Sequence, residues 1–525
     1  MKKLELIDIA LVSILFLSSV FVWSIPIRNI QMPYGEPDST HHFGVSDYFS
    51  QNDKIADKYP LYLYFAYAHA TPNKEGAIVY PPQFFINMAL FQMITNERIF
   101  SYFFFLAIID SFVVLCLYFL MSNLYGRLIG FASSFLLIFS KIDLLTHMMG
   151  QYVVLISLSM VPLILYAYYE YTKNYLSGQN KPIYLYVIAF LLSVQFLTHF
   201  QAIAHSIITL ALFTIFLIIK ERKLPFNIKH AIIAIIVFAI VLGPFIVKPV
   251  EYSQASGLKS VDVGLGDLFK WYSSGYTTVA VSKDIFSYSA MHASWTLPFL
   301  FIGVFLLILK REKRDLLILS WLIAVYLILH FDILLKMNPS RVFRSINDVA
   351  HIFYPIVAIG FINICEFIKT NEETKKYIKY GLTILFILLI LIFNAHSSYS
   401  MLKDSYSYPM RLNPYQYEAA NWIKSNLPED SLVLASGTLT QKVSWWLRVT
   451  SQRQIFEDVL HIQLAERDYP QLGKINPGYL LFDYSELYML RQQEGIDQLQ
   501  TVEKNMTVNS KLLYDKNYVK VYEIG

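Results

Sequence analysis

Long apolar segments recur along the chain and constrain its fold more than any other feature of the sequence. About eleven of them approach the ~20 residues that a helix needs to cross the hydrocarbon core of a bilayer. Only 16% of the 525 residues are charged, whereas an ordinary soluble protein is roughly a quarter charged. We therefore expect most of the chain to lie in lipid. The segments are residues 5–25, 99–121, 128–140, 148–168, 182–198, 202–219, 230–249, 292–309, 315–335, 346–368 and 377–392.

The basic connections between these segments predict which side of the membrane each loop occupies. Loops rich in Lys and Arg stay on the cytoplasmic side. If the apolar segment 81–95 lies on the membrane instead of crossing it, all basic connections fall on one side. This arrangement predicts a multi-pass protein of the cell membrane with a cytoplasmic N-terminus and an outer C-terminus. The basic connections are residues 1–3, 172–181, 220–229, 310–314 and 369–376.

Charge and cysteine content exclude several classes of function. A net charge of +4 is too small to indicate a nucleic-acid partner. The two cysteines, Cys116 and Cys365, both lie inside apolar runs, which excludes a disulfide framework or a thiolate zinc site. The first apolar segment lacks a small-residue cleavage site and precedes many further spans, so we interpret it as a retained span.

The outer side is predicted to carry the polar parts of the chain. We expect a transmembrane domain over residues 1–397, including a long first outer loop over 26–98, and a soluble outer domain over 398–525. In the latter, residues 414–426 predict an amphipathic helix ended by the turn at Pro428. Short strand-like runs follow at 432–435, 479–483 and 511–522. The predicted fold class is an α-helical polytopic bundle of about eleven spans with a small C-terminal α/β domain.

The first outer loop begins with a group of ionisable residues. Gly35 and Pro37 indicate a turn, after which Asp38 is placed to cap a helix whose first turn carries His41 and His42. This brings carboxylates, including Glu36, and imidazoles together just beyond the first span. Either these residues form a functional site, or Asp38 is only a helix cap and the histidines are interfacial polar groups.

Two later outer turns carry further ionisable residues. The segment 140–147 holds Lys141, Asp143 and His147, and Gly150-Gln151 follow inside the next span. His199 lies in another outer turn, with His205 one turn further along. Ionisable groups at membrane depth are functional candidates by default, although a solvated turn or a packed histidine is the simpler alternative.

A pair of arginines, Arg341 and Arg344, lies three residues apart at an expected outer helix start. Since they lie outside, they are not the cytoplasmic charges of the positive-inside rule. Asp348 and His351 continue the same face into the membrane. Such a pair suits bidentate phosphate binding; the alternatives are an Arg344–Asp348 ion pair or contact with lipid headgroups.

This pattern resembles the GT-C superfamily of membrane glycosyltransferases, which includes protein mannosyltransferases, aminoarabinose transferases and the catalytic subunit of oligosaccharyltransferase. The resemblance rests on the order and common sidedness of short motifs over essentially the whole chain. They are the acid in the first outer loop (Asp38), Tyr80-Pro81-Pro82, the late arginines Arg341 and Arg344, and an outer domain that opens with Trp422-Ile423 and Pro428.

The resemblance implies inverting transfer of a sugar from a polyprenyl-phosphate donor to a lipid, glycan or protein acceptor. Asp38 matches the general base, and Arg341 or Arg344 matches the residue that holds the lipid phosphate. Glu36, His41, His42, Lys141, His147 and His199 are the further expected substrate-binding residues. In the oligosaccharyltransferase branch, an Asp-x-Asp motif holds a metal; this chain has Asp143 preceded by Lys141. A divalent cation such as Mg or Mn on Asp143 is therefore expected only by resemblance.

Three alternatives compete with this prediction. Oligosaccharyltransferases read acceptor peptides with Trp-Trp-Asp, and the chain has Trp445-Trp446-Leu447-Arg448, which does not support peptide recognition; the pair is either core or a sugar-stacking platform. A flippase or transporter of lipid-linked saccharides should carry pseudo-repeats and place its ionisable residues near mid-span. This sequence, in contrast, displays no internal repeat and concentrates most of its notable ionisable residues at the outer span ends. A catalytically dead binding protein of the same fold is the third alternative.

Overall fold

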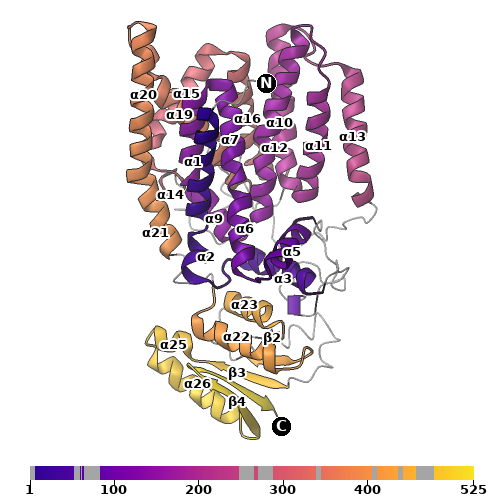
Figure 1. The fold of residues 1–525 in the computed structure, drawn as a ribbon, viewed down its shortest axis with the longest axis vertical. Coiled ribbons are helices and arrows are strands. Elements are labelled where there is room, and N and C mark those ends of the chain that lie inside the picture. Colours follow the sequence, from indigo (N-terminus) through magenta and orange to yellow (C-terminus); the bar gives the residue numbers. More distant parts are fainter. Residues whose placement is uncertain are drawn as a thin grey trace.

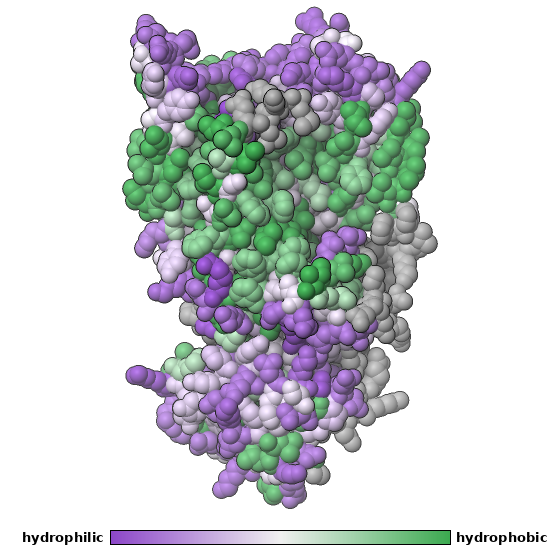
Figure 2. Space-filling model, in the orientation of Figure 1, coloured by the Kyte–Doolittle hydropathy of each residue, from purple (hydrophilic) through white to green (hydrophobic). Residues whose placement is uncertain are grey.

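The structure is a computed structural model, and it describes residues 6–52, 60, 62–63, 83–246, 265–269, 288–337, 344–404, 411–435, 441–456 and 478–524. A bundle of long helices forms one part, and a smaller unit of helices and strands is attached at one end (Figure 1). Hydrophobic side chains form a broad band around the bundle, between hydrophilic surfaces at both ends (Figure 2). This distribution is that of a multi-pass membrane protein.

Long helices of the bundle correspond to the apolar segments of the sequence. Within the described residues, six helices are long and apolar enough to cross a membrane, or seven if the pair α8 and α9, bent by 45°, is one span. The expected total of about eleven crossings and the side of the N-terminus stay predictions. The bundle helices are α1 (Leu6–Trp23), α6 (Phe100–Asp110), α7 (Phe112–Tyr125), α8 (Arg127–Ile138), α10 (Tyr152–Leu176), α11 (Ile183–Thr198), α12 (Phe200–Glu221), α13 (Ile228–Ile246), α15 (Leu297–Lys310), α16 (Lys313–Ile328), α19 (Val349–Ile362) and α20 (Glu372–Leu389).

Helix α19 is the central element of the bundle, since all 14 of its residues are buried. Two glycines let it approach α15 closely. A Cβ on Gly303 would lie 2.1 Å from the Ile356 carbonyl oxygen, and one on Gly360 would lie 2.0 Å from that of Phe299. Small residues at such contacts let helices pack backbone to backbone. This packing fixes α19 against α15, and the N-terminal turn of α19 carries His351.

Short helices connect the long ones. At the end of the bundle that faces the C-terminal unit lie α2 (Ile25–Ile30), α3 (Pro37–Asn52), α5 (Gln83–Thr95), α9 (Lys141–Met148) and η6 (Arg344–Asp348). Helix α5 is in the apolar segment that we expected to lie on the membrane surface, while Tyr80-Pro81-Pro82 lie outside the described residues. The remaining connecting helices are η2 (Leu265–Phe269), α14 (Tyr288–Met291), η5 (Ser294–Thr296), α17 (Phe331–Leu334), η7 (Asn363–Phe367), η8 (Ile390–Ala395) and α21 (His396–Asp404).

The C-terminal unit contains a five-stranded mixed sheet in the order β2-β1-β3-β5-β4. Strands β1 (Leu432–Ala435) and β3 (Tyr479–Asp483) confirm two predicted strands, and the third predicted run is a hairpin of β4 (Ser510–Lys516) and β5 (Val519–Ile524). Strand β2 (Gln454–Phe456) was not predicted. The helices are α22 (Pro414–Asn426), α23 (Gln441–Ser451), α25 (Ser485–Met489) and α26 (Gln493–Met506).

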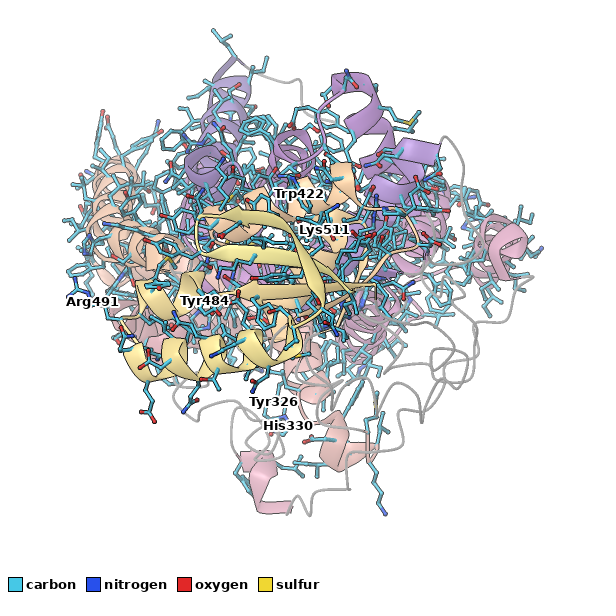
Figure 3. All side chains as sticks on the ribbon, turned by 90° about the horizontal axis from the view of Figure 1, so that it is seen from below. Tyr326, His330, Trp422, Tyr484, Arg491 and Lys511 are labelled. Atoms are coloured by element: carbon cyan, nitrogen blue, oxygen red, sulfur yellow. The ribbon has the colours of Figure 1, made fainter. Side chains whose placement is uncertain are left out.

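The sheet covers only part of the end of the bundle to which the C-terminal unit is attached. Seen from below, Tyr326 and His330, near the end of α16, lie beside the sheet and α26 and not beneath them (Figure 3). The strand pairing Tyr34↔Arg411 joins the first outer loop to the segment that enters the C-terminal unit. The division of the chain near residue 397 stays a prediction, although the sheet and its helices all follow it.

Candidate functional site

Asp38 lies in the first turn of α3, which begins at Pro37. The expectation that Asp38 caps this helix is wrong, because the Glu36 carbonyl accepts the first helical bond, from the Ser39 amide (2.8 Å). An acid in the first turn is stabilised by the positive end of the helix dipole. The Asp38 side chain is half-buried, so its carboxylate lies at the edge of the packed interior.

The start of α3 is fixed against the turn between α9 and α10. The Ser39 hydroxyl donates to the Tyr34 carbonyl (2.7 Å) and lies 2.7 Å from the Tyr152 hydroxyl at the start of α10. Gly150 has φ +83°, and a Cβ there would lie only 2.2 Å from the Ser39 amide nitrogen. A side chain at Gly150 would therefore displace the turn that carries Asp38.

The same turn also contacts the helical segment that follows the late arginines. The Asn347 side-chain amide donates to the Gln151 side-chain oxygen (2.8 Å), which ties η6 to the α9–α10 turn. Arg344 begins η6, and Arg341 lies outside the described residues. The segments that carry Asp38 and Arg344 therefore meet at one turn, Gly150-Gln151.

A chain of alternating acids and histidines lies beneath this turn. Asp143 Oδ1 is 2.7 Å from His351 Nε2, and His351 Nδ1 is 3.5 Å from Asp348 Oδ1. Asp348 Oδ2 in turn lies 2.5 Å from His205 Nδ1. All four side chains are buried, and they join α9, α12 and α19. An ion pair between Arg344 and Asp348, the alternative considered above, would have to compete with two histidines. Both carboxylate oxygens of Asp348 already face His205 or His351.

The segment 141–148 is a helix, α9, and not the solvated turn that we considered as an alternative. Ser140 caps it by accepting from the Asp143 amide (3.4 Å). His147 is buried, with Nδ1 2.6 Å from Asp110 Oδ2 and Nε2 3.2 Å from the Tyr34 hydroxyl. In this structure His147 joins α9 to α6 and to the first outer loop. Its role in substrate binding stays a prediction.

The other expected histidines also lie in packed surroundings. His41 and His42 are buried, and their rings contact Phe85 and Phe84 of α5 (centroids 5.8 and 5.3 Å apart). Burial and the neighbouring His42 lower the pKa of His41 well below its ordinary value, so His41 stays neutral near pH 7. His199, between α11 and α12, is buried too, and its carbonyl accepts from Ser157 (3.1 Å).

Lys141 borders a cavity of about 750 Å³, a volume that includes its open mouth. Aromatic rings of Phe139, Trp295 and Phe393 form much of its lining, with the polar side chains of Asn394 and Ser398 among them. Trp295 donates to Asn394 (3.0 Å). A cavity with mostly apolar walls and a lysine at its border suits a lipid that carries an anionic head.

The C-terminal unit contacts the same first outer loop. Trp446 of α23 is fully buried and donates from its indole nitrogen to the Gly35 carbonyl (2.8 Å), three residues before Asp38. Of the two alternatives for the tryptophan pair, Trp446 is therefore core. Its packing also places the C-terminal unit directly beside the α3 turn.

A metal ion on Asp143 stays a prediction. Within the described residues, no three His, Cys, Asp or Glu side chains are arranged to hold a metal ion, and one Asp143 oxygen faces His351. We assign no chemistry through a metal.

Sequence reasoning missed several residues that shape the site. Asp110 pairs with His147, Ser39 and Tyr152 hold the α3 turn, and Asn347 holds η6. Asp110 had a usable signal, because it is a lone acid inside an apolar run. Ser39 and Asn347 had none, since their partners lie 113 and 196 residues away in the sequence.

Comparisons with known proteins identify the fold. The sequence matches no family model and no curated protein. The structure is similar to a crystal structure of the Archaeoglobus fulgidus oligosaccharyltransferase in complex with Zn and sulfate, with a TM-score of 0.57 and 14% identity over 98% of this chain and 72% of that one. It is also similar to ArnT from Cupriavidus metallidurans in the apo state, with a TM-score of 0.55 and 9% identity over 98% of both chains.

The chain has the fold of these two proteins over nearly its whole length. The fold that the resemblance predicted is thereby confirmed. Two further similar structures contain lipid phosphates. The archaeal enzyme AglB was solved with an inhibitory peptide and a dolichol-phosphate (TM-score 0.56, 13% identity, 98% of this chain and 74% of that one), and ArnT was solved with undecaprenyl phosphate (TM-score 0.50, 10% identity, 98% and 97%).

Proposed function

We propose that this GT-C chain is an inverting glycosyltransferase that uses a polyprenyl-phosphate-linked sugar and acts at the outer end of the bundle. The observation that carries the proposal is the meeting of two segments at the Gly150-Gln151 turn. One holds Asp38 through Ser39, and the other begins with Arg344 and is held through Asn347. Sugar transfer from a lipid phosphate requires a base and a cationic residue near one another, and here the segments that carry them meet at one turn.

In the proposed reaction, the Asp38 carboxylate accepts the proton of an acceptor hydroxyl. The acceptor oxygen then forms a bond to the anomeric carbon of the sugar, on the face opposite the phosphate. The bond between that carbon and the phosphate oxygen breaks, and polyprenyl phosphate leaves with the electron pair. Arg341, Arg344 and Lys141 stabilise the charge that develops on the departing phosphate.

The lipid part of the donor is assigned to the cavity beside Lys141. Its aromatic walls suit isoprenoid units, and Lys141 at its border suits the phosphate. The lipid phosphates bound by the AglB and ArnT neighbours support this class of donor. Those neighbours share only 14% identity or less with this chain, so they do not indicate the sugar.

Protein glycosylation of the oligosaccharyltransferase kind is the alternative, because one neighbour was solved with an acceptor peptide tethered to it. Two features of this chain disfavour it. Leu447 stands where the peptide-reading motif has its Asp, and Trp446 is buried against Gly35. We therefore favour a lipid or glycan hydroxyl as the acceptor.

The test is a transfer assay with the purified chain in nanodiscs, radiolabelled polyprenyl-phosphate sugars, and membrane lipids or glycans as acceptors. We expect the wild type to transfer label and Asp38→Asn to lose about 10²–10⁴-fold in rate, while it still binds the donor. Asp515→Asn, an exposed acid in β4, is the matched control and should retain full activity.

Two results would contradict the proposal. Unchanged transfer by Asp38→Asn would remove Asp38 from the role of base. If the wild type transfers no sugar but moves labelled lipid between leaflets, the chain is a flippase and the glycosyltransferase assignment is wrong.

A further inference from the structure

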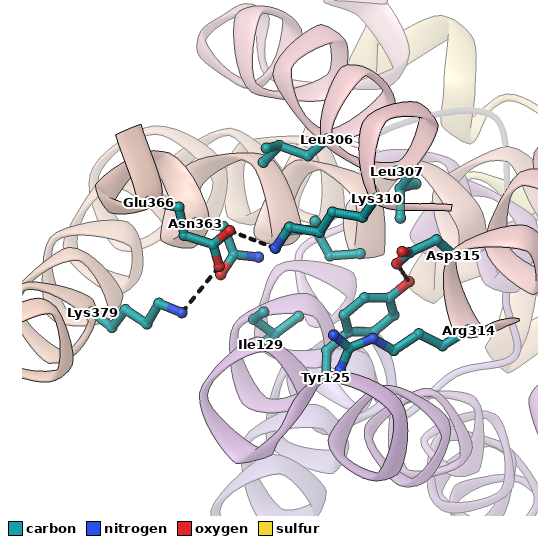
Figure 4. Close-up of a pocket in the computed structure, with 11 residues that line it drawn as sticks. Tyr125, Ile129, Leu306, Leu307, Lys310, Arg314, Asp315, Asn363, Glu366 and Lys379 are labelled. Carbon is teal, nitrogen blue, oxygen red and sulfur yellow. Dashed lines mark hydrogen bonds and ion pairs between the residues drawn. The ribbon is translucent and has the colours of Figure 1, made fainter. Parts of the chain in front are cut away.

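A second, charged pocket lies in the bundle at the end opposite the C-terminal unit. Helices α7, α8, α15, α16, α19, α20 and η7 contribute to its wall, and it encloses about 470 Å³, including its open mouth. Lys310, Arg314, Glu366 and Lys379 supply its charges, together with Asp315 (Figure 4). Since Lys310 and Arg314 belong to a basic connection, this is the end that the positive-inside rule assigns to the cytoplasm.

The pocket is lined by three cations, Lys310, Arg314 and Lys379, and by two acids, Asp315 and Glu366. Arg314 also pairs with Glu312 beside the pocket. Asp315 is fully engaged. One of its oxygens accepts from the Tyr125 hydroxyl (2.8 Å) and the other from the Glu312 amide (2.9 Å). Glu366 is shared between Lys310 (2.5 Å) and Lys379 (3.4 Å). One carboxylate thus serves two ammonium groups.

Donors in the pocket remain unsatisfied. Arg314 donates from Nη1 to the Leu124 carbonyl (2.9 Å), and its Nη2 lies 2.8 Å from Glu312. Its Nε is buried and has no hydrogen-bond partner among the described residues. A buried donor without a partner is costly, and an oxyanion in the pocket would satisfy it. An ammonium group has three donors, so Lys379, at 3.4 Å from Glu366, also has capacity for another acceptor.

The helices beside the pocket favour a lipid over a free anion. On α20, Ile384, Leu385 and Leu388 are 47–61% exposed, and on α15, Phe305 and Leu309 are 53% and 58% exposed. These apolar side chains lie on the same helices as Lys379 and Lys310, and a broad hydrophobic band surrounds the bundle (Figure 2). The acyl chains of a phospholipid could lie on this apolar surface while the phosphate of the same molecule enters the pocket.

We propose that this pocket binds the phosphate group of an anionic phospholipid from the leaflet at this end of the bundle. Basic pockets between membrane helices on the cytoplasmic side are suited to such headgroups. The phosphate accepts from Arg314 Nε and from Lys379. This site lies at the other end of the bundle from Asp38 and does not depend on the proposed glycosyltransferase activity.

The test is native mass spectrometry of the full-length chain in detergent, titrated with phosphatidylglycerol, phosphatidylcholine or glycerol 3-phosphate. We expect tighter binding of phosphatidylglycerol than of zwitterionic phosphatidylcholine, and no retention of the chain-free glycerol 3-phosphate. Equal binding of the two lipids would overturn the proposal. Retention of glycerol 3-phosphate at equal strength would overturn the assignment to a lipid and leave a soluble phosphate as the ligand.

Three variants locate the binding. Lys379→Gln should weaken phosphatidylglycerol binding about five-fold, the effect expected for one basic residue. Lys375→Gln is the matched control, because Lys375 lies one turn away on α20, pairs with Glu372 (3.0 Å) and does not line the pocket. Glu366→Gln removes an acid from the pocket and should strengthen binding. A purely structural ion-pair cluster predicts no gain with Glu366→Gln, and that result would overturn the proposal.

Discussion

Single contacts between distant residues determine where Asp38 lies. The residue itself stood out in the sequence, because an acid follows a Gly-Pro turn just after the first span. Its position does not follow from that motif. It depends on Ser39 packing against Gly150 and bonding Tyr152, more than a hundred residues away. No local pattern indicates such a contact. The sequence therefore singled out Asp38 as a candidate base but did not predict its surroundings.

Gly150→Ala tests whether this contact positions Asp38. A Cβ at position 150 would meet the Ser39 backbone, so we expect transfer to fall about 100-fold, the effect of displacing a catalytic group by roughly 1 Å. Gly178→Ala is the matched control, since Gly178 has a similar φ of +81° but nothing within 4 Å of its added Cβ. An alanine at either position has a positive φ, so both variants should lose about 1–3 kcal/mol of stability to backbone strain. Thermal unfolding measures this loss. Equal transfer rates in the two would show that the contact does not position the site.

Elements with strong local signals were predicted well, and elements defined by distant packing were not. Helix α22 has the predicted limits because Asn413 and Gln416 form a capping box around Pro414. The segment of helix α9 was ambiguous in sequence, because its polar residues are also typical of a solvated turn. What distinguishes it is the contact of Asp143 with His351 of another helix, which no local pattern indicates. Strand β2 has only three residues and exists because β1 pairs with it. The hairpin β4–β5 appeared in sequence as one run, because its turn, at Asn517 and Tyr518, contains no Gly or Pro.

Glu503 on α26 should make the stability of the C-terminal unit depend on acid pH. Burial alone would raise the pKa of Glu503, but hydrogen bonds from Tyr484 and Tyr522 and the Lys520 ammonium lower it below its ordinary 4.5. A lowered pKa means that the carboxylate stabilises the fold above about pH 4.5 and that this stability is lost as pH falls through the folded-state pKa.

Unfolding of the wild type followed between pH 3 and 7 should therefore show a loss of stability at the acid end. Glu503→Gln should be less stable at pH 7 by about 2 kcal/mol, because charge-assisted bonds are lost, and should show a shallower acid limb. Parallel pH profiles for the two proteins would contradict this role of Glu503.

At the scale of the whole molecule, the C-terminal unit is joined to the end of the bundle beside it through a partly buried ion pair. Arg98 lies 2.7 Å from Asp47 on α3 and donates to the carbonyls of Val449 (2.9 Å) and Thr450 (3.2 Å) at the end of α23. Gln452 donates to the other Asp47 oxygen (2.9 Å). The same helix α3 thus carries Asp38 at one end and the docking contact further along.

Arg98→Ala should loosen this attachment. It leaves Asp47 buried without its cation, at a cost of about 3 kcal/mol, so we expect faster limited proteolysis between α21 and α22 and reduced transfer. Arg491→Ala removes an exposed arginine at the edge of the same unit (Figure 3) and should change neither. If the two variants are cleaved at the same rate, the Arg98 contact does not hold the unit in place.

We propose that the Asp38 turn, the Gly150-Gln151 turn and η6 together surround one lipid-phosphate site. Photolabelling with a benzophenone-bearing polyprenyl phosphate, followed by peptide mapping, tests this claim most directly. We predict label on α9, on the start of α10 and on η6, and its loss when unlabelled polyprenyl phosphate competes. Label confined to the opposite end of the bundle, or label that does not respond to competition, would contradict the account.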